Sequence, residues 1–365
     1  MKKISTMLLT SMLLMQTSIA FASDMSPIDI INKVTQNKNQ SFSGTRLQKV
    51  VRGNLSLESN ANVDYVDSNN FNITIKSPNA ISGLKYATNS GKSIIYFPYE
   101  KLSFTDAIPS SGDMITDTIM GKITSDPNLL QRNYIISFKK DDEIVSNSTY
   151  VIDIKPRTDT YSAQDNKVWH TPRRTFWINK SNFQILREDR SWSEDNQAFF
   201  SSQYTTYKPL SYSNSPNVRV KLPYNVKKVP LGKKNSEIET YFESYSNILD
   251  FEKGDKEKII SPKYLPTGFK LKEIQVLNFY DTKIILQKYN DGLNSMFVTY
   301  RSRPNFFLTL LAGNFSLDLL HKMSELSLNA PYNYITRETK GNLVISFGDI
   351  LPDELQKVNN SVTVS

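Results

Sequence analysis

The chain contains no cysteine, only 2 histidines and only 13 glycines among its 365 residues. Without cysteine it can form no disulfide bond and cannot carry a lipid anchor on an N-terminal cysteine. Histidine and cysteine together are too few to supply the ligands of a zinc site. The scarce glycines form no glycine-rich loop that could cradle a phosphate. We therefore expect neither a bound metal ion nor a cofactor.

The sequence also lacks the residue combinations that mark common active sites. His170 and His321 fall in different predicted domains, and the neighbours of His170 form no nucleophile elbow. Paired carboxylates for glycoside hydrolysis remain an alternative, because folding rather than spacing brings such pairs together. The acidic run 141–143, however, is typical of an exposed turn. We predict no catalytic residues and a protein that is not an enzyme.

No apolar run reaches the ~20 residues that a membrane-spanning helix needs. The longest early stretch, from Met7 to Ile19, follows Lys2 and Lys3 and precedes Ala20-Phe21-Ala22. A charged start, a short apolar stretch and an Ala-x-Ala site are the three parts of a secretory signal peptide. The sequence therefore predicts a signal peptide over 1–22, cleavage after Ala22 and export of the remaining chain.

The formal net charge of +8 is modest for a chain of this length. Such a charge favours anionic lipid head groups or acidic partner segments, or it serves solubility alone. Nucleic acid is the least suitable partner for an exported protein, and we predict none. The remaining chain is longer than one typical domain of ~100–200 residues, so we expect two domains.

The first predicted domain, 23–211, is rich in strand-like segments. A short amphipathic helix is expected over 27–37, and a helical or looping stretch over 113–131 interrupts the strands. About eight strands alternating apolar and polar residues predict a long antiparallel sheet. One face of such a sheet must be covered, and the two helical stretches are the candidates. A strongly bent sheet with helices on its concave side is the simplest arrangement.

Aromatic and aliphatic side chains gather on the strand-like segments of this domain. They could form an ordinary core. They could instead line an apolar cavity that takes acyl chains, as a curved, half-open sheet would allow. The residues predicted to line that cavity are Phe71, Ile73, Ile75, Tyr86, Tyr96, Phe97, Phe104 and Trp177.

The segment 212–258 differs in composition and is predicted to be a linker. Its first part is basic and its second part is acidic. Helical spacing of five apolar residues predicts an amphipathic helix, through Ile238, Tyr241, Phe242, Tyr245 and Leu249. The segment is either a connector packed against a domain or a partner-binding helix.

The second predicted domain, 259–365, begins with a tight turn. Pro266 fixes φ, Gly268 permits a positive φ, and Phe269 enters the following strand. Strands are expected over 269–278, 283–289 and 293–301, with Asp291-Gly292 as a hairpin turn. A helix near 316–327, a hairpin of 332–338 with 342–347, and a helix after Pro352 complete the domain.

Several of these segments resemble a known family. The turn 264–269, the strand 296–300 and the closing segment 342–360 resemble the C-terminal domain of the MucB/RseB family, periplasmic regulators of the sigma-E envelope stress response. The N-terminal part is similar to the lipoprotein carriers LolA and LolB, through Phe42-Ser43-Gly44, the strand 89–98 and the strand 176–180.

The resemblance implies an α+β protein with a LolA-like half-open antiparallel β-barrel, covering helices and a smaller α+β C-terminal domain. It implies a periplasmic regulator that senses a lipidated or hydrophobic ligand and binds the periplasmic domain of an anti-sigma factor. That partner would be shielded from proteolysis until the ligand binds. The alternative is a periplasmic lipid carrier or chaperone of the LolA type, whose partner is a lipoprotein. Two segments depart from the family pattern, 113–127 and 304–331.

Overall fold

The computed structural model describes much of the chain, and the following statements concern only this part. The described residues are 25–36, 41–67, 69–90, 92–105, 123, 126–157, 168–194, 197–211, 216–230, 240–255, 259–279, 282–301, 332–340 and 342–363. The predicted signal peptide 1–22, the segment 304–331 with its predicted helix 316–327, and most of 113–127 lie outside these residues.

A 13-stranded sheet dominates the first half of the described chain. Its order is β13-β6-β5-β4-β3-β2-β1-β12-β11-β10-β9-β7, with β8 paired to β9. The strands are β1 (Phe42–Arg52), β2 (Leu55–Asp67), β3 (Asn70–Ser77), β4 (Lys85–Asn89), β5 (Lys92–Phe97), β6 (Leu102–Thr105), β7 (Tyr134–Phe138), β8 (Asp142–Ile144), β9 (Asn147–Pro156), β10 (Arg173–Asn179), β11 (Ile185–Ser191), β12 (Phe200–Pro209) and β13 (Lys227–Pro230). The predicted antiparallel pairing is confirmed except at β13, which pairs with β6 in parallel and makes the sheet mixed. The prediction of about eight strands was too low, because the sheet has 13.

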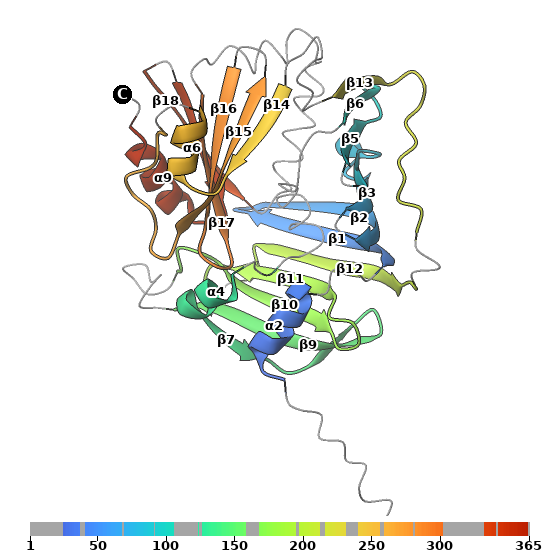
Figure 1. Cartoon of the computed structure of the whole chain (residues 1–365). Helices are drawn as coiled ribbons and strands as arrows, with labels where there is room; N and C mark the ends of the chain where they lie inside the picture. The colour runs from blue at the N-terminus through green and yellow to red at the C-terminus, as the bar shows by residue number, and fades with distance from the viewer. Residues whose placement is uncertain are drawn as a thin grey trace, which may run out of the picture.

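Two short helices accompany this sheet. Helix α2 (Pro27–Gln36) starts with reciprocal capping, because the Ser26 amide donates to Asp29 Oδ2 at 3.1 Å and the Asp29 amide donates to Ser26 Oγ at 3.3 Å. It lies across β9 and β10 in Figure 1, with Ile30 and Ile31 fully buried. Helix α4 (Pro127–Asn133) starts where Asp126 accepts the Leu129 amide at 3.0 Å. Both helices therefore begin at sequence-encoded caps.

The second sheet has 6 strands in the order β14-β15-β16-β17-β19-β18. They are β14 (Thr240–Tyr245), β15 (Lys270–Phe279), β16 (Thr282–Asn290), β17 (Ser295–Arg301), β18 (Asn333–Thr339) and β19 (Asn342–Gly348). Helices α6 (Ile248–Asp255) and α9 (Pro352–Ser361) accompany it (Figure 1). Phe251 of α6 and Leu355 and Val358 of α9 join the strand residues in one core. None of the helices in the described part of the chain is long and apolar enough to cross a membrane.

The segment predicted as a linker contributes strands to both sheets. Strand β13 extends the first sheet and β14 pairs with β15 of the second. The predicted helix through Tyr241 and Tyr245 is wrong, because Thr240–Tyr245 is a strand. Its aromatic residues favour a strand once a free edge such as that of β15 is available. A helix begins only at Ile248, where Asn247 Oδ1 caps it by accepting the Asp250 amide at 2.9 Å.

Candidate functional site

One face of the large sheet carries two buried groups of side chains, and we call it the inward face. Residues that lie opposite each other on neighbouring strands point to the same face of a sheet. Gln48 on β1 lies opposite Ser202 on β12, Ser202 lies opposite Glu188 on β11, and Glu188 lies opposite Phe176 on β10. This register places both groups on the same face. The apolar cluster consists of Phe42, Ala61, Val63, Phe71, Ile73, Ile75, Ile81, Leu84, Tyr86, Phe97, Leu102, Leu186, Tyr204 and Tyr207. The docking cluster consists of Ile30, Ile31, Ile123, Leu130, Tyr134, Ile152, Ile154, Phe176, Ile178, Ile185 and Leu293.

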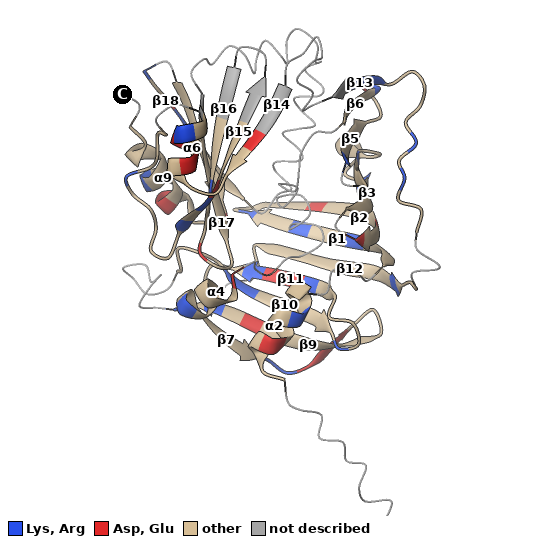
Figure 2. Ribbon diagram, viewed as in Figure 1, with Lys and Arg blue, Asp and Glu red and all other residues tan. Residues whose placement is uncertain are grey.

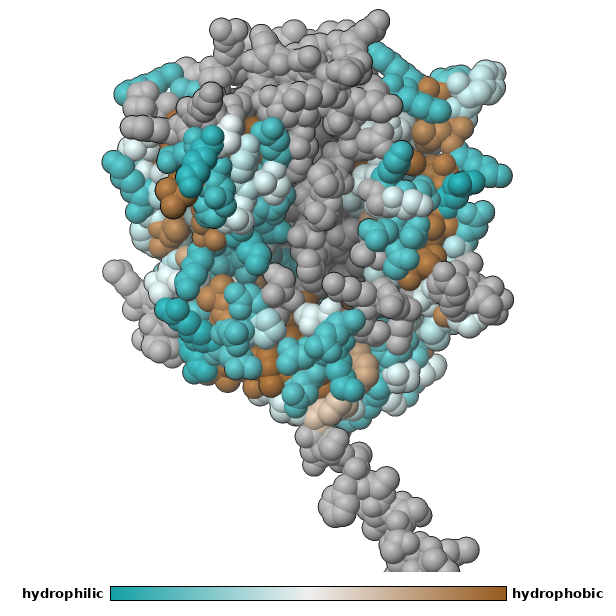
Figure 3. Space-filling model, viewed as in Figure 1, coloured by the Kyte–Doolittle hydropathy of each residue, from teal (hydrophilic) through white to brown (hydrophobic). Residues whose placement is uncertain are grey.

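Most residues predicted to line a cavity belong to the apolar cluster. Phe71, Ile73 and Ile75 alternate along β3 and are buried together, as a period of two residues requires. Tyr86 lies opposite Ile73 on the neighbouring strand. Phe97 is also a member, and Phe104 packs against the cluster with its ring centroid 6.2 Å from that of Phe97. Figure 3 shows hydrophobic residues along the side of the molecule that carries β3 to β6.

The structure separates Tyr96 and Trp177 from the other predicted residues. Tyr96 precedes Phe97 on the same strand, so its side chain points to the opposite face. Trp177 lies between two members of the docking cluster and likewise points outward, where its Nε1 donates to Asp142 Oδ2 at 2.9 Å. The guanidinium of Arg187 lies 4.3 Å from its ring centroid. Neither residue faces the apolar cluster.

The docking cluster is completed by a hairpin of the second domain. Leu293, in the turn between β16 and β17, is the one member of this cluster that comes from the C-terminal sheet region. Gly292 beside it has φ +102°, and a Cβ added there would lie 2.5 Å from the Leu130 amide nitrogen. The turn therefore rests directly on the backbone of α4, at a distance that only glycine allows.

Asp291 binds this turn to the first domain. Its Oδ2 accepts a hydrogen bond from the Tyr134 hydroxyl at 2.5 Å, and its Oδ1 accepts from the Leu293 and Asn294 amides at 2.9 and 2.7 Å. Asn133 Nδ2 donates to the Asp291 carbonyl at 2.6 Å. Burial raises the pKa of Asp291 to about 6, although these hydrogen bonds favour the ionised carboxylate and oppose the increase.

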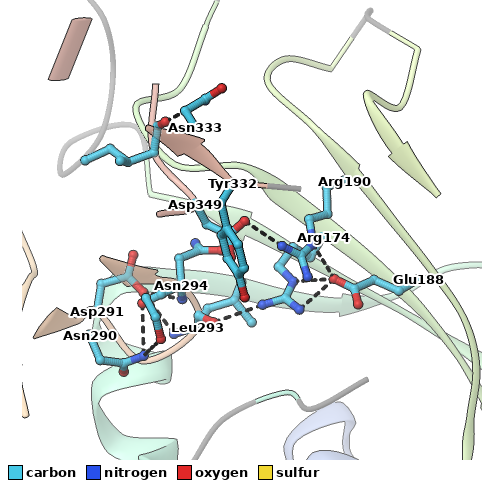
Figure 4. Close-up of polar contacts among 12 residues, drawn as sticks. Arg174, Glu188, Arg190, Asn290, Asp291, Leu293, Asn294, Tyr332, Asn333 and Asp349 are labelled. Atoms are coloured by element: carbon cyan, nitrogen blue, oxygen red, sulfur yellow. Dashed lines mark hydrogen bonds and ion pairs between the residues drawn. The ribbon is translucent and has the colours of Figure 1, made fainter. Parts of the chain in front are cut away.

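A chain of buried charges lies beside the hairpin (Figure 4). Arg174 Nη1 donates to the Leu293 carbonyl at 2.9 Å and Nε donates to Glu188 Oε1 at 2.7 Å. Arg190 Nε donates to the same oxygen at 2.6 Å, and Arg190 Nη1 donates to Asp349 Oδ1 at 2.5 Å. Figure 2 shows the basic and acidic residues close together on β10 and β11. This series of buried charges therefore connects the two domains.

Burial and charge pairing together set the ionisation of these four residues. For Asp349, burial outweighs the charges of Arg190 and Arg174 and raises the pKa. Burial opposes ionisation of Glu188, but the charges of Arg174 and Arg190 outweigh it and lower the Glu188 pKa. Burial likewise opposes the charge on Arg190, but Asp349 and Glu188 outweigh it and raise the Arg190 pKa. All four side chains are almost fully buried. Removing one partner would leave an uncompensated charge in the interface.

Two hydrogen bonds to backbone carbonyls extend the interface between the domains. The Leu351 amide donates to the His170 carbonyl at 2.9 Å, and Arg52 Nη2 donates to the Tyr332 carbonyl at 2.8 Å. His170 Nδ1 also lies 3.8 Å from Glu354 Oε1 at the start of α9. His170 therefore contacts the second domain through both its backbone carbonyl and its side chain. In the described ranges, no group of histidine and carboxylate side chains could hold a metal ion.

The turn that begins the C-terminal domain has the tight backbone geometry predicted from its proline and glycine. Gly268 has φ +93°, and the Phe269 amide donates to the Pro266 carbonyl at 3.2 Å. Phe269 is buried in the core of the second sheet. This geometry directs the chain into β15 and buries Phe269 as the strand begins.

Sequence reasoning missed the interface residues, although some signals were present. Asp291 was assigned to a hairpin turn only, and no role was predicted for Glu188, which lies within the continuous strand Ile185–Ser191. Along β11 the inward positions 186, 188 and 190 hold Leu, Glu and Arg. Charges at positions where alternation demands apolar residues are the signal that could have indicated a buried ion pair.

No protein-family model and no curated protein matches the sequence. Solved structures do match it. A crystal structure of MucB covers 91% of this chain and 96% of its own, with 14% identity and a TM-score of 0.54. The complex structure of Pseudomonas aeruginosa MucA/MucB covers 91% and 96%, with 13% identity and a TM-score of 0.53.

The chain has the MucB fold. A crystal structure of MucB in complex with MucA(peri) also matches, covering 91% of this chain and 97% of that chain at 13% identity and a TM-score of 0.52. The resemblance to MucB is thus confirmed at the level of the fold. A LolA superfamily protein from Nitrosomonas europaea matches 51% of this chain at 10% identity, with a TM-score of 0.23 that supports no conclusion.

Proposed function

We propose that this protein is a periplasmic, non-enzymatic regulator of an envelope-stress sigma/anti-sigma system. The observation that carries the proposal is the match to MucB over 91% of the chain, together with the crystallisation of MucB with MucA(peri). The match spans both sheets and therefore includes the domains and the interface between them. By analogy, the partner is the periplasmic domain of a membrane-bound anti-sigma factor. The protein itself would be peripheral to the membrane at most.

The proposed division of the chain follows this assignment. A signal peptide, 1–22, is removed after Ala22, and 23–211 forms the LolA-like half-open β-barrel that binds a lipidated or hydrophobic ligand. The segment 212–258 connects it to the partner-binding domain, 259–365. Intact mass of the protein from the periplasmic fraction tests the cleavage site.

The apolar cluster is the proposed ligand site. Phe71, Ile73 and Tyr86 present a continuous apolar surface on the inward face, extended by Phe97 and Phe104. Apolar side chains arranged on a curved sheet suit the acyl chain of a lipid or lipoprotein. The docking cluster lies on the same face, so a ligand and the second domain bind neighbouring parts of one sheet.

This arrangement gives the regulator a physical mechanism. A ligand can change partner binding only if it binds the partner-bound and partner-free states with different affinity. We infer that an acyl chain on the apolar cluster changes partner affinity by shifting the sheet that carries Arg174 and Arg190. These two residues hold the second domain through Leu293 and Asp349.

A carrier or chaperone of lipoproteins is the second candidate, and the apolar cluster favours it equally. The regulator is preferred because a carrier does not require the second domain, which here is joined to the first by buried ion pairs. The carrier would transfer lipoprotein between membranes. The regulator would bind an anti-sigma factor.

The test is direct binding of the exported chain to the periplasmic segment of an anti-sigma factor encoded beside its gene, measured by calorimetry. We expect saturable 1:1 binding to that segment and none to a shuffled version of it. Absence of binding, together with transfer of a lipoprotein between membrane vesicles, would favour the carrier. Binding of neither partner would contradict both functions.

A further inference from the structure

A second polar site lies on the inward face, between the apolar cluster and the buried charge chain. Arg46 on β1 is only 2% exposed, and its Nε donates to Ser202 Oγ at 2.6 Å. Within the described residues, Arg46 Nη1 and Nη2 have no hydrogen-bond partner. The ring of Tyr204 lies 5.1 Å from the guanidinium carbon. The Tyr204 hydroxyl and Glu188 Oε2 likewise have no hydrogen-bond partner among the described residues, although the Arg46 charge acts on both groups.

An unpartnered buried guanidinium is costly, because its hydration is lost and no protein acceptor replaces it. The charge of Glu188 interacts with Arg46, but Glu188 Oε1 already accepts hydrogen bonds from Arg174 and Arg190, so the surrounding carboxylates do not balance the three arginines. Three buried arginines, at positions 46, 174 and 190, face the two buried carboxylates of Glu188 and Asp349. This local group therefore has one excess positive charge, and a single negative charge from a ligand would neutralise it.

The geometry also limits the chemistry of that ligand. Because Nε is occupied by Ser202, the guanidinium presents its two Nη groups side by side. Two adjacent N–H donors match the two oxygens of a carboxylate, which carries one negative charge. A phosphate monoester carries ≈ −1.5 to −2 at neutral pH and would overcompensate the excess charge.

Apolar side chains continue from this site. Tyr204 belongs to the apolar cluster, and its ring meets that of Phe42 edge to face at a centroid distance of 5.6 Å. Leu186, also in the cluster, lies two residues from Glu188 on the same face of β11. We propose that Arg46 binds the carboxylate of a fatty-acid-like amphiphile whose acyl chain lies on the apolar cluster. This inference rests on the proposed acyl site and names the head group that the site selects.

Three probes with the same chain length test it: dodecanoate, dodecanol and dodecyl phosphate, titrated into the full exported chain. We expect dodecanoate to bind about tenfold or more tightly than dodecanol, as a charge-assisted hydrogen bond allows. Arg46→Met should remove this preference while dodecanol binding stays unchanged. Lys49→Met is the matched control, because Lys49 on the same strand is exposed and its Nζ lies 3.7 Å from Glu58 Oε1; it should keep the preference.

The outcomes separate the head-group site from the acyl site. Equal affinity for dodecanoate and dodecanol in the wild-type protein overturns the Arg46 site and leaves the acyl site intact. Tighter binding of dodecyl phosphate than of dodecanoate overturns the assignment to a carboxylate. Failure of all three probes to bind overturns both the head-group site and the proposed acyl site.

Two further variants keep the inference testable if Arg46→Met does not fold. Arg46→Lys retains the charge but loses the paired donors, so dodecanoate affinity should fall several-fold. Tyr204→Phe removes only the unpartnered hydroxyl and should lower dodecanoate affinity while leaving dodecanol affinity unchanged. Unaltered selectivity in both folded variants would overturn the inference.

Discussion

The inward face of the large sheet differs between its two ends. Between β7 and β11 it is covered by α2, α4 and the β16–β17 turn, and its polar groups pair across the domain interface. Between β2 and β6 it carries the apolar cluster, to which no α-helix of the described residues contributes a member. One sheet therefore provides both a docking surface and a candidate ligand surface. The buried ion pairs lie at the docking surface, whereas the buried Arg46 borders the candidate ligand surface.

The largest expected effect is a loss of stability when an ion pair is broken at the docking end of the sheet, between β7 and β11. Arg190→Met should destabilise the protein by ~3–5 kcal/mol, because Asp349 would remain buried without its cation. Arg187→Met on the same strand is the matched control, because Arg187 points outward and its pair with Asp189 is partly exposed; we expect a loss of at most ~1 kcal/mol. Urea unfolding of the full chain measures both. Equal losses would show that the interface charges have no special role.

The second effect is a pH dependence that only the docking end should show. The folded-state pKa of Asp291 is raised to about 6, above the ~3.9 of an exposed aspartate. The folded protein therefore holds this proton more tightly, and the resulting stabilisation is complete below about pH 4 and lost as pH rises through about 6.

We expect the free energy of unfolding of the wild type to fall by up to ~3 kcal/mol across this window, relative to Asp291→Asn, which removes the titrating group. Urea unfolding of both proteins between pH 4 and pH 8 provides the difference. A difference that stays constant across the window would contradict the raised pKa.

The third effect tests whether the turn at the start of the C-terminal domain is purely architectural. Gly268→Val should cost more than ~1 kcal/mol, since Gly268 has φ +93° and a β-branched residue tolerates that region poorly. Thr267→Val, in the exposed neighbouring position, should be close to neutral. Thermal unfolding measures both, and acyl-ligand affinity should change in neither. Similar behaviour of the two variants would remove the special role of Gly268.

The smallest expected effect is a change in ligand affinity that distinguishes the two faces of the sheet at its ligand end, between β2 and β6. Phe104 packs at the edge of the apolar cluster, whereas Tyr96 points to the other face of the neighbouring strand. Phe104→Ala should weaken binding of an acylated peptide about fivefold, in line with the loss of ~1 kcal/mol of apolar contact. Tyr96→Ala should leave the affinity unchanged. Titration calorimetry, with circular dichroism to verify folding, decides between an acyl site and an ordinary core.

Alternation along single strands could be predicted from the sequence, and it placed Phe71, Ile73 and Ile75 together correctly. Neighbouring residues on a strand point to opposite faces, so Tyr96 and Phe97 cannot both line one cavity, although both were predicted to do so. Trp177 is different. It stands in a run of three apolar residues, Phe176 to Ile178, in which no alternation reveals the face.

The interface could not be derived from local pattern. Arg190 and Asp349 are 159 positions apart, and Tyr134 and Asp291 are 157 apart. Turn propensity placed Asp291-Gly292 correctly as a hairpin, but propensity carries no information on which surface the turn contacts. The free edge of β15 likewise decided that Thr240–Tyr245 is a strand. Tertiary pairing, rather than local preference, set these elements.

On the proposed mechanism, an acyl ligand at the β2–β6 end of the sheet controls partner binding by the whole protein. The decisive measurement is the affinity for the anti-sigma periplasmic segment with and without a saturating acylated peptide. We expect the peptide to weaken partner binding by ~5–150-fold, and the partner to weaken peptide binding by the same factor. Partner affinity that is unchanged by bound peptide would contradict the account.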